Sequence, residues 1–159
     1  MKASRAAILC LALALVLTAC NEGNDEGGDF EVALEAGNEV CDGDTSASTP
    51  PSFRVTCGGV GSGEATIEIN SDRNEVCYEF SLEGVENVNA AHIHAAPSGE
   101  AGDPVVDLQY DGNDSGAEAC VDDIDESVLE EIAEEPERHY VNVHTDEYPD
   151  GAARAQLDD

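Results

Sequence analysis

The feature that most constrains the fold of this chain is a one-by-one alternation of apolar and polar residues in short segments. In an extended strand, successive side chains project to opposite sides of the backbone, so such a segment buries one face and leaves the other polar. The segment 64–70, for example, places Ala65, Ile67 and Ile69 on one face. The pattern predicts β-strands at 30–34, 64–70, 76–82, 90–95, 105–110, 140–145 and 152–157, with a short strand at 53–56.

Turn-forming residues separate these segments, and one segment has a helical pattern. Gly, Pro, Asn, Asp and Ser gather at 71–74, 97–104, 111–116 and 148–151. Between residues 125 and 135, Val128, Leu129 and Ile132 fall on one side of a helix, which Pro136 ends. About eight short strands and one short connecting helix predict an all-β fold, a β-sandwich or barrel.

The segment 111–116 has two interpretations. Its spacing of Asp and Asn resembles the start of a calcium-binding loop, with Asp122 at the twelfth position. A calcium loop of that kind has helices on both sides and Glu at its twelfth position, and this sequence lacks both features. We therefore interpret the segment as a hairpin turn.

The N-terminal segment predicts export and a lipid anchor. Lys2 and Arg5 precede an apolar run at 6–17, which is shorter than the roughly 20 residues that a membrane-spanning helix needs. Leu17-Thr18-Ala19-Cys20 then has the pattern of a bacterial lipobox, although an ordinary signal peptide with a coincidental cysteine is the alternative. We expect a signal peptide at 1–19, lipid on Cys20, a flexible tether at 20–29, one domain at 30–159, and a location at the cell surface or in the periplasm.

The charge of the chain limits its partners. Once 1–19 is removed, four basic and 36 acidic side chains remain, so the net charge is −32, and no lysine is left. Nucleic acid is excluded as a natural partner, because phosphate binding needs Lys and Arg, and docking on anionic lipid is disfavoured. Salt screens self-repulsion of this size. We therefore favour adaptation to a salt-rich habitat over a surface that gathers cations.

Four cysteines follow the lipidated one, and an even number in an exported chain predicts disulfides. Cys41, Cys57, Cys77 and Cys120 allow three pairings. We prefer Cys41–Cys57, which closes a loop rich in Gly, Ser, Thr and Pro, and Cys77–Cys120, which joins two strand-like segments across the core. A zinc site is the alternative, but these cysteines form no C-x-x-C pair.

Three of the four histidines share one strand face. His92 and His94 flank Ile93, and His144 ends the segment 140–144. Residues two apart in a strand point the same way. All three imidazoles therefore lie opposite the apolar side chains, which are Ala91, Ile93, Val141 and Val143. His139 has the opposite parity, and we leave it out of the set.

An H-x-H pair with a third histidine on another strand is a common way to hold zinc or copper. The sequence therefore predicts a metal site at His92, His94 and His144, on condition that the two strands are neighbours. The alternative is that hydrogen bonds to loops fix these histidines without a metal. The acidic surroundings attract cations but also favour the imidazolium form, which cannot ligate.

Two motifs in the chain resemble the CHRD domain, which is named for its repeats in chordin. The first is Ala91-His-Ile-His-Ala95 with Gly99, 102–106 and Leu108, and the second is 140–145 with 148–151 and 154–157. The resemblance covers about residues 30–157. It implies an immunoglobulin-like β-sandwich or barrel, here in a bacterial lipoprotein. In chordin the repeats belong to an extracellular binding protein, which implies binding rather than catalysis.

These patterns lead to three hypotheses of function. The first is a non-enzymatic extracellular binding or structural module, since the sequence has no G-x-S-x-G nucleophile motif. The second is a copper or zinc site on the three histidines, with redox chemistry open to copper. The third is a surface that buffers cations through its carboxylates. Besides the membrane that the lipid anchor enters, the expected partner is an extracellular protein or a metal ion.

Overall fold

The computed structural model describes residues 27–40, 59–110, 112 and 116–158. Both histidine-containing motifs lie within these ranges. The expected signal peptide, the lipidated Cys20, the strand at 53–56 and the Cys41–Cys57 disulfide lie outside the described residues.

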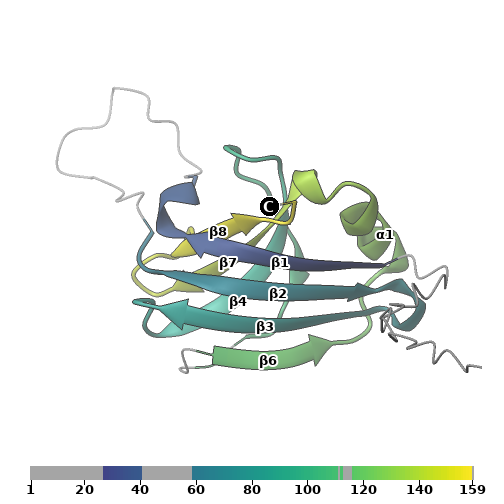
Figure 1. Cartoon of the computed structure of the whole chain (residues 1–159), viewed down its shortest axis with the longest axis horizontal. Helices are drawn as coiled ribbons and strands as arrows, with labels where there is room; N and C mark the ends of the chain where they lie inside the picture. The colour runs from purple at the N-terminus through teal and green to yellow at the C-terminus, as the bar shows by residue number, and fades with distance from the viewer. Residues whose placement is uncertain (1–26, 41–58, 111, 113–115, 159) are drawn as a thin grey trace, which may run out of the picture.

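Eight strands form one sheet that curls on itself (Figure 1). In chain order they are β1 Gly27–Glu35, β2 Ser62–Asn70, β3 Glu75–Glu83, β4 Val88–Ala95, β5 Pro104–Asp107, β6 Gly116–Val121, β7 His139–Thr145 and β8 Ala153–Gln156. The order across the sheet is β5-β4-β7-β8-β1-β2-β3-β6, and every pairing is antiparallel. In Figure 1, β1, β2, β3 and β6 form the front of the curl, with β4, β7 and β8 behind them. The expected all-β sandwich or barrel is confirmed.

The core lies inside the curl, where the apolar faces of the alternating segments meet. β2 and β3 pair along their whole lengths, so that Ile67 stands opposite Tyr78. Burying one such side chain contributes about 1.5–3 kcal/mol, and the alternation supplies one at every second position. The largest fully buried core residues come from both sides of the curl and include Leu34, Ile67, Phe80, Ile93, Leu108 and Val141.

A short helix closes one end of the curl (Figure 1). α1 spans Glu126–Glu134, close to the expected 125–135, and Asp125 caps it by accepting a hydrogen bond from the Ser127 backbone N–H at 3.0 Å. Leu129 and Ile132 are fully buried, and the helix packs on β1 and β2. Three 3-10 turns complete the elements: η1 Ala36–Asn38, η2 Ser71–Arg73 and η3 Pro136–Arg138.

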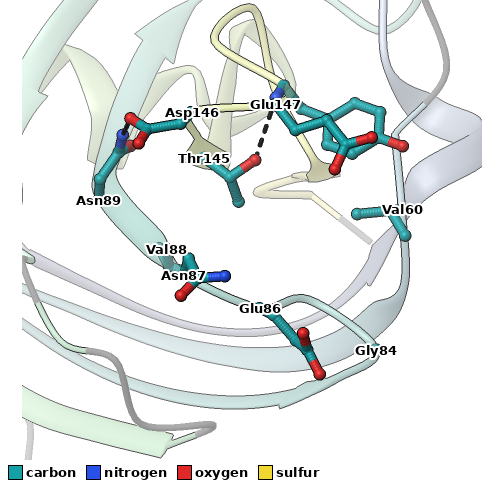
Figure 2. A pocket seen from close by; sticks show the side chains of 10 residues that line it. Val60, Gly84, Glu86, Asn87, Val88, Asn89, Thr145, Asp146 and Glu147 are labelled. Carbon is teal, nitrogen blue, oxygen red and sulfur yellow. Dashed lines mark hydrogen bonds between the residues drawn. The ribbon is translucent and has the colours of Figure 1, made fainter.

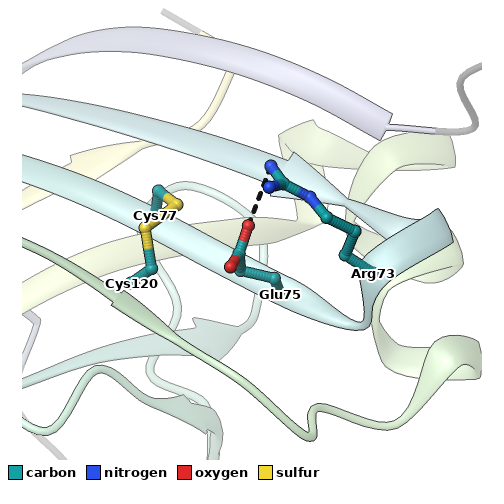
Figure 3. Close-up of a disulfide and its surroundings, with 4 residues drawn as sticks. All are labelled: Arg73, Glu75, Cys77 and Cys120. Atoms are coloured by element: carbon teal, nitrogen blue, oxygen red, sulfur yellow. Dashed lines mark ion pairs between the residues drawn. A yellow bond between two sulfur atoms is a disulfide. The ribbon is translucent and has the colours of Figure 1, made fainter.

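The Cys77–Cys120 disulfide is present, but it does not cross the core (Figure 3). Cys77 of β3 and Cys120 of β6 are register partners on neighbouring strands. Cys77 alternates with the buried Val76, so the bond lies on the outer face of the front strands, near the Arg73–Glu75 ion pair. The pairing expected from the sequence is correct, and the expected position is wrong, because these two strands are neighbours in one sheet.

Two segments differ from the strand predictions. β5 is shorter than the expected 105–110, because Gln109 has a φ of +52° and ends the extended backbone. β6 is not among the strands that alternation predicts, since small residues occupy most of it, although the segment around Cys120 was expected to be strand-like. The segment 111–116 connects β5 to β6, which stand at opposite ends of the strand order, so it is not a hairpin turn between paired strands. Four of its six residues lie outside the described ranges.

Candidate metal site

His92, His94 and His144 lie side by side on the outer face of β4 and β7. The two strands pair antiparallel, with His92 opposite Asn142 and His94 opposite Tyr140. The ring centroids of His92 and His144 are 4.8 Å apart, and His94 lies 5.5–5.6 Å from both. One ring nitrogen from each histidine lies within 4.8 Å of the other two. The two strands are neighbours, as the prediction required, and the three imidazoles converge.

Two of the three histidines are buried, although their side chains point away from the core, and His92 is half-buried. His94 is 8% exposed and His144 is 7% exposed. The connection from β4 to β5 contributes a backbone carbonyl from Gly102 to His94, and the turn from β7 to β8 contributes one from Pro149 to His144. These two segments cover the outer face. The parity read from the sequence is therefore correct, but it does not make this a surface site.

The hydrogen bonds of two rings fix their tautomers. His94 Nδ1 lies 2.9 Å from the Gly102 carbonyl oxygen, and His144 Nδ1 lies 3.1 Å from that of Pro149. A carbonyl oxygen only accepts, so each Nδ1 carries the hydrogen, and in the neutral ring Nε2 carries a lone pair. The two Nε2 atoms face each other at 3.4 Å. Metal-binding histidines characteristically donate their other ring N–H in this way.

The separation of these nitrogens matches metal coordination. Zinc–nitrogen bonds of about 2.0–2.1 Å at a tetrahedral angle place two ligand nitrogens about 3.3–3.4 Å apart. The third ring nitrogen, from His92, lies within 4.8 Å of the other two, and two ligands of one ion are at most about 4.2 Å apart on the same bond lengths. His92 makes neither of the carbonyl contacts.

Burial keeps the rings in the form that binds a metal. It lowers the pKa of His144 to about 4, with further lowering by the charges of His92 and His94. Burial also lowers the pKa of His94, against the hydrogen bond to Gly102, which raises it. Both rings are thus neutral at pH 7. Desolvation outweighs the acidic surroundings at His94: among the described residues one carboxylate, that of Asp103, raises its pKa, and its effect is the smallest of those named.

Two side chains, Tyr140 and Arg154, form a stack with the ring of His94. Its ring lies parallel to that of Tyr140, with an interplanar angle of 9° and a centroid distance of 4.8 Å. The Arg154 guanidinium carbon lies 3.3 Å from the Tyr140 centroid, a cation–π arrangement. The Tyr140 hydroxyl accepts from the Gly102 N–H at 3.2 Å. The same residue, Gly102, thus anchors both aromatic rings.

Arg154 and Gln156 hold the covering segment in place. Arg154, 2% exposed, donates to the carbonyls of Glu100 at 2.8 Å and Pro97 at 3.3 Å. Gln156 donates to the Ala96 carbonyl at 2.9 Å. Periodicity places both residues on the outer face of β8, but only the resemblance to the CHRD motif singles them out. His139, as expected from its parity, is on the core side and outside the set, with Nδ1 at 2.9 Å from the Glu135 carbonyl oxygen.

A second group that could hold a metal is already occupied by a covalent bond. Glu75, Cys77 and Cys120 come close together among the described residues. The two sulfur atoms are joined in the disulfide (Figure 3), so neither is a thiolate ligand.

A cavity of about 800 Å³, here called the mouth cavity, opens at one end of the curl (Figure 2). It adjoins the turns that follow β3 and β7. The start of β3, at the other end of the strand, follows the η2 turn that packs on α1. Val60, Val88 and Tyr148 give it apolar walls. The side chains of Glu86, Asp146 and Glu147 also line it, with Asp146 accepting from the Asn89 amide at 2.7 Å. A smaller cavity, of about 440 Å³, is lined by Asn38, Glu39, Arg154 and Gln156 among others.

The curled antiparallel sheet with a largely buried histidine cluster on its outer face defines an all-β domain, and comparison with known families gives its class. The model of the CHRD domain matches residues 30–157. The chain belongs to the CHRD family, an extracellular type of module. No curated protein and no solved structure matched the chain. None of the helices in the described residues is long and apolar enough to cross a membrane.

Proposed function

We propose that this CHRD module binds one transition-metal ion, copper or zinc, through His92, His94 and His144. The observation that carries the proposal is the 3.4 Å separation of two buried Nε2 atoms whose rings are both held at Nδ1. Hydrogen bonds to loops alone would satisfy Nδ1 and give no reason for the other nitrogens to face each other. A metal ion between them replaces the repulsion of two lone pairs with two bonds.

The rival explanation for the close nitrogens is a shared proton. The lowered pKa of His144 works against it, because the ring holds an extra proton only below about pH 4. Imidazole nitrogen suits both zinc and copper, and three histidines leave a coordination position for water or another ligand. The donor set therefore fits either ion.

The test is metal content and affinity in protein purified without chelator. We expect close to one copper or zinc per chain, and one tight site in calorimetry that persists in 1 M salt. Replacing all three histidines by alanine should abolish that site and leave weak, salt-sensitive binding to carboxylates. His139→Asn, which keeps a donor near the position of Nδ1, is the matched control and should bind as the unaltered protein does. Unchanged binding in the triple variant would refute the proposal.

The proposed setting of the site is an exported protein that is anchored by lipid on Cys20. The lipobox pattern and the signal-like 1–19 segment support it, and so does membership in an extracellular type of family. In a bacterial host, the mature protein should partition into the membrane fraction, with the mass of a diacylglycerol on its first residue. Cys20→Ser should release it. Recovery of the Cys20→Ser protein in the membrane fraction would exclude this anchor.

A second candidate function is non-enzymatic binding of a cationic segment of an extracellular protein in the mouth cavity. Three carboxylates line the cavity, and none of the lining residues is basic. The carboxylates of the mouth cavity do not converge on one point as a metal group does. A lysine or arginine side chain suits such a cavity, because its stem packs on apolar walls and its head meets carboxylates.

The probe for the mouth cavity is a short lysine-rich peptide, followed by NMR of the backbone amides. Shifts should concentrate at 84–89 and 145–148, and Glu86→Gln with Asp146→Asn should weaken them several-fold. Glu64→Gln with Glu79→Gln, which removes two carboxylates from exposed positions of β2 and β3, is the control for net charge. Equal weakening of peptide binding by both pairs of substitutions would show that the peptide responds only to the net charge of the protein.

A further inference from the structure

We propose that Asn142 is the positioning residue for His92: its side-chain oxygen accepts the Nδ1–H of His92, and Glu39 holds the amide in place. The inference rests on the proposed metal site and assigns it a third anchored ring. His94 and His144 already have their anchors in the structure, and His92 is the ligand without one.

Two buried polar atoms without partners belong to neighbouring residues of this site. Among the described residues, His92 Nδ1 and Asn142 Oδ1 are both buried and make no hydrogen bond. The two residues are register partners across β4 and β7. Both side chains project to the outer face, because Ile93 and Val141 take the core side. Partners of this kind have Cβ atoms about 4.5–5.5 Å apart, so a ring rotation brings the nitrogen to the oxygen.

The energy of these two atoms favours the contact. A buried donor or acceptor without a partner costs about 1–3 kcal/mol, and buried polar atoms in proteins are rarely left in that state. A ring nitrogen that carries hydrogen donates, and an amide oxygen accepts. One hydrogen bond between His92 Nδ1 and Asn142 Oδ1 removes both costs.

The same hydrogen bond completes the ligand set. It would give His92 the tautomer that Gly102 and Pro149 impose on the other two rings, with Nδ1 protonated and Nε2 open to the metal. Asn142 lies between Tyr140 and His144 along β7. A movement of His92 toward Asn142 is therefore a movement toward β7, the strand that carries His144.

The amide of Asn142 is oriented by its own donors. Its Nδ2 donates to Glu39 Oε2 at 3.3 Å and to the Asp150 carbonyl at 3.4 Å. With both amide hydrogens used, the oxygen is left for another donor. Gly151 makes this arrangement fit, because a Cβ there would overlap Glu39 Oε2 and would lie 2.5 Å from Asn142 Nδ2. Burial raises the pKa of the half-buried Glu39 carboxyl to about 7.

The experiment measures zinc affinity and the histidine tautomers together. Zinc is titrated into the full-length protein labelled with ¹⁵N in its histidines, and two-bond ¹H–¹⁵N spectra identify the nitrogen that carries hydrogen. In the unaltered protein all three zinc-bound rings should be protonated at Nδ1. Asn142→Ala should weaken zinc 10–100-fold, the usual effect of losing such a partner, and should release His92 alone from the fixed tautomer.

Rescue separates positioning from general damage to the fold. In the pair Glu39→Gln with Asn142→Asp, the donor and acceptor of the Glu39–Asn142 contact are exchanged, and a carboxylate oxygen remains for His92. This pair should regain most of the lost affinity. Asn89→Ala, on the exposed start of β4, is the matched control and should change nothing. If Asn142→Ala does not fold, Asn142→Ser should show the same loss, since its oxygen ends short of the ring.

The outcomes distinguish this inference from the metal proposal. Zinc bound to the unaltered protein with equal affinity and the same His92 tautomer in Asn142→Ala would overturn the role of Asn142 and leave the metal site standing. No tight zinc binding in the unaltered protein would overturn both. Weakened binding with His94 and His144 still fixed, followed by rescue in the exchanged pair, is the result that we expect.

Discussion

The outer side of the front strands and the outer side of the rear strands follow the same alternation of apolar and polar residues, but their environments are opposite. On the front strands β2 and β3, the outward residues Glu64, Thr66, Glu68 and Glu79 are exposed. On β7 and β8 behind them, every residue is buried on both faces. The outward set there is Tyr140, Asn142, His144, Arg154 and Gln156, each at most 7% exposed.

The difference comes from the connections and not from the strands. The strands β2 and β3 are joined by the short η2 turn at the end of the sheet, so their outer face meets water and tolerates carboxylates. The longer connection after β4 folds back over the rear strands and provides carbonyl oxygens to His94, Arg154 and Gln156. A polar face that is buried must find partners for all its polar atoms. It is thereby organised into a site, whereas the solvated face is not.

Loss of the Cys77–Cys120 bond should give the largest effect on stability, without affecting the site. Its partners are separated by 43 residues, and closing a loop of that size stabilises a fold by about 3–4 kcal/mol. Cys77→Ser with Cys120→Ser should lower the free energy of unfolding in urea by that amount. Zinc stoichiometry should stay the same. A loss of zinc binding in the folded double variant would break the separation of the two faces.

The two arginines, one on each face, provide a matched comparison. Arg154→Met should lower the free energy of unfolding by about 3 kcal/mol, because it leaves the part-buried Glu100 carbonyl and the buried Gln156 side-chain oxygen without that donor. Arg73→Met removes only an exposed ion pair to Glu75 and should cost at most about 1 kcal/mol. Equal costs in urea unfolding would mean that the covered face is as solvated as the front.

Zinc should stabilise the protein only through the histidine site on the covered face. At a free zinc concentration 100 times the dissociation constant, binding should add about 2.7 kcal/mol to the free energy of unfolding. In the triple histidine-to-alanine variant, zinc should add nothing, although every carboxylate of the front face is intact. A similar gain in both proteins would place the metal effect on the acidic surface.

The smallest expected effect concerns pH and the carboxyl of Glu39, which the covering segments bury. Its pKa in the folded protein is raised to about 7, from 4.5. The stability that it contributes is therefore fully present below about pH 4.5 and is lost as the pH rises through 7. Glu39→Gln should remove that loss and, after allowance for solvent screening, make the protein about 1 kcal/mol more stable than the unaltered chain at pH 8.

The control for Glu39 is Glu31→Gln on the exposed face of β1, which removes one negative charge without changing a buried contact. Thermal unfolding at pH 5 and pH 8 measures both variants. If Glu31→Gln stabilises the protein at pH 8 as much as Glu39→Gln does, the effect is one of net charge. It would then say nothing about burial.

Local chemistry in the sequence was sufficient for much of the fold. Alternation marked six of the eight strands closely, a helical spacing of apolar residues marked the helix, and parity separated His92, His94 and His144 from His139. Alternation did not mark β6, of which only the segment around Cys120 was expected to be strand-like, because Gly, Ala and Cys occupy four of its six positions and small side chains carry little alternation. The Cys77–Cys120 pairing was found, but not its place, since nothing in the spacing says which strands are neighbours.

What the sequence by itself determined is which side of each strand faces the core, because a two-residue period fixes side-chain direction locally. What only the tertiary structure decided is the environment of the other side. Whether an outward residue meets water or a covering segment depends on contacts between residues far apart in the chain, such as His144 with Pro149 and Asn142 with Glu39. Contacts of this kind, and not the alternation, place the Nε2 atoms of His94 and His144 3.4 Å apart. They also bury the His144 ring, whose pKa falls to about 4, so that the ring is neutral.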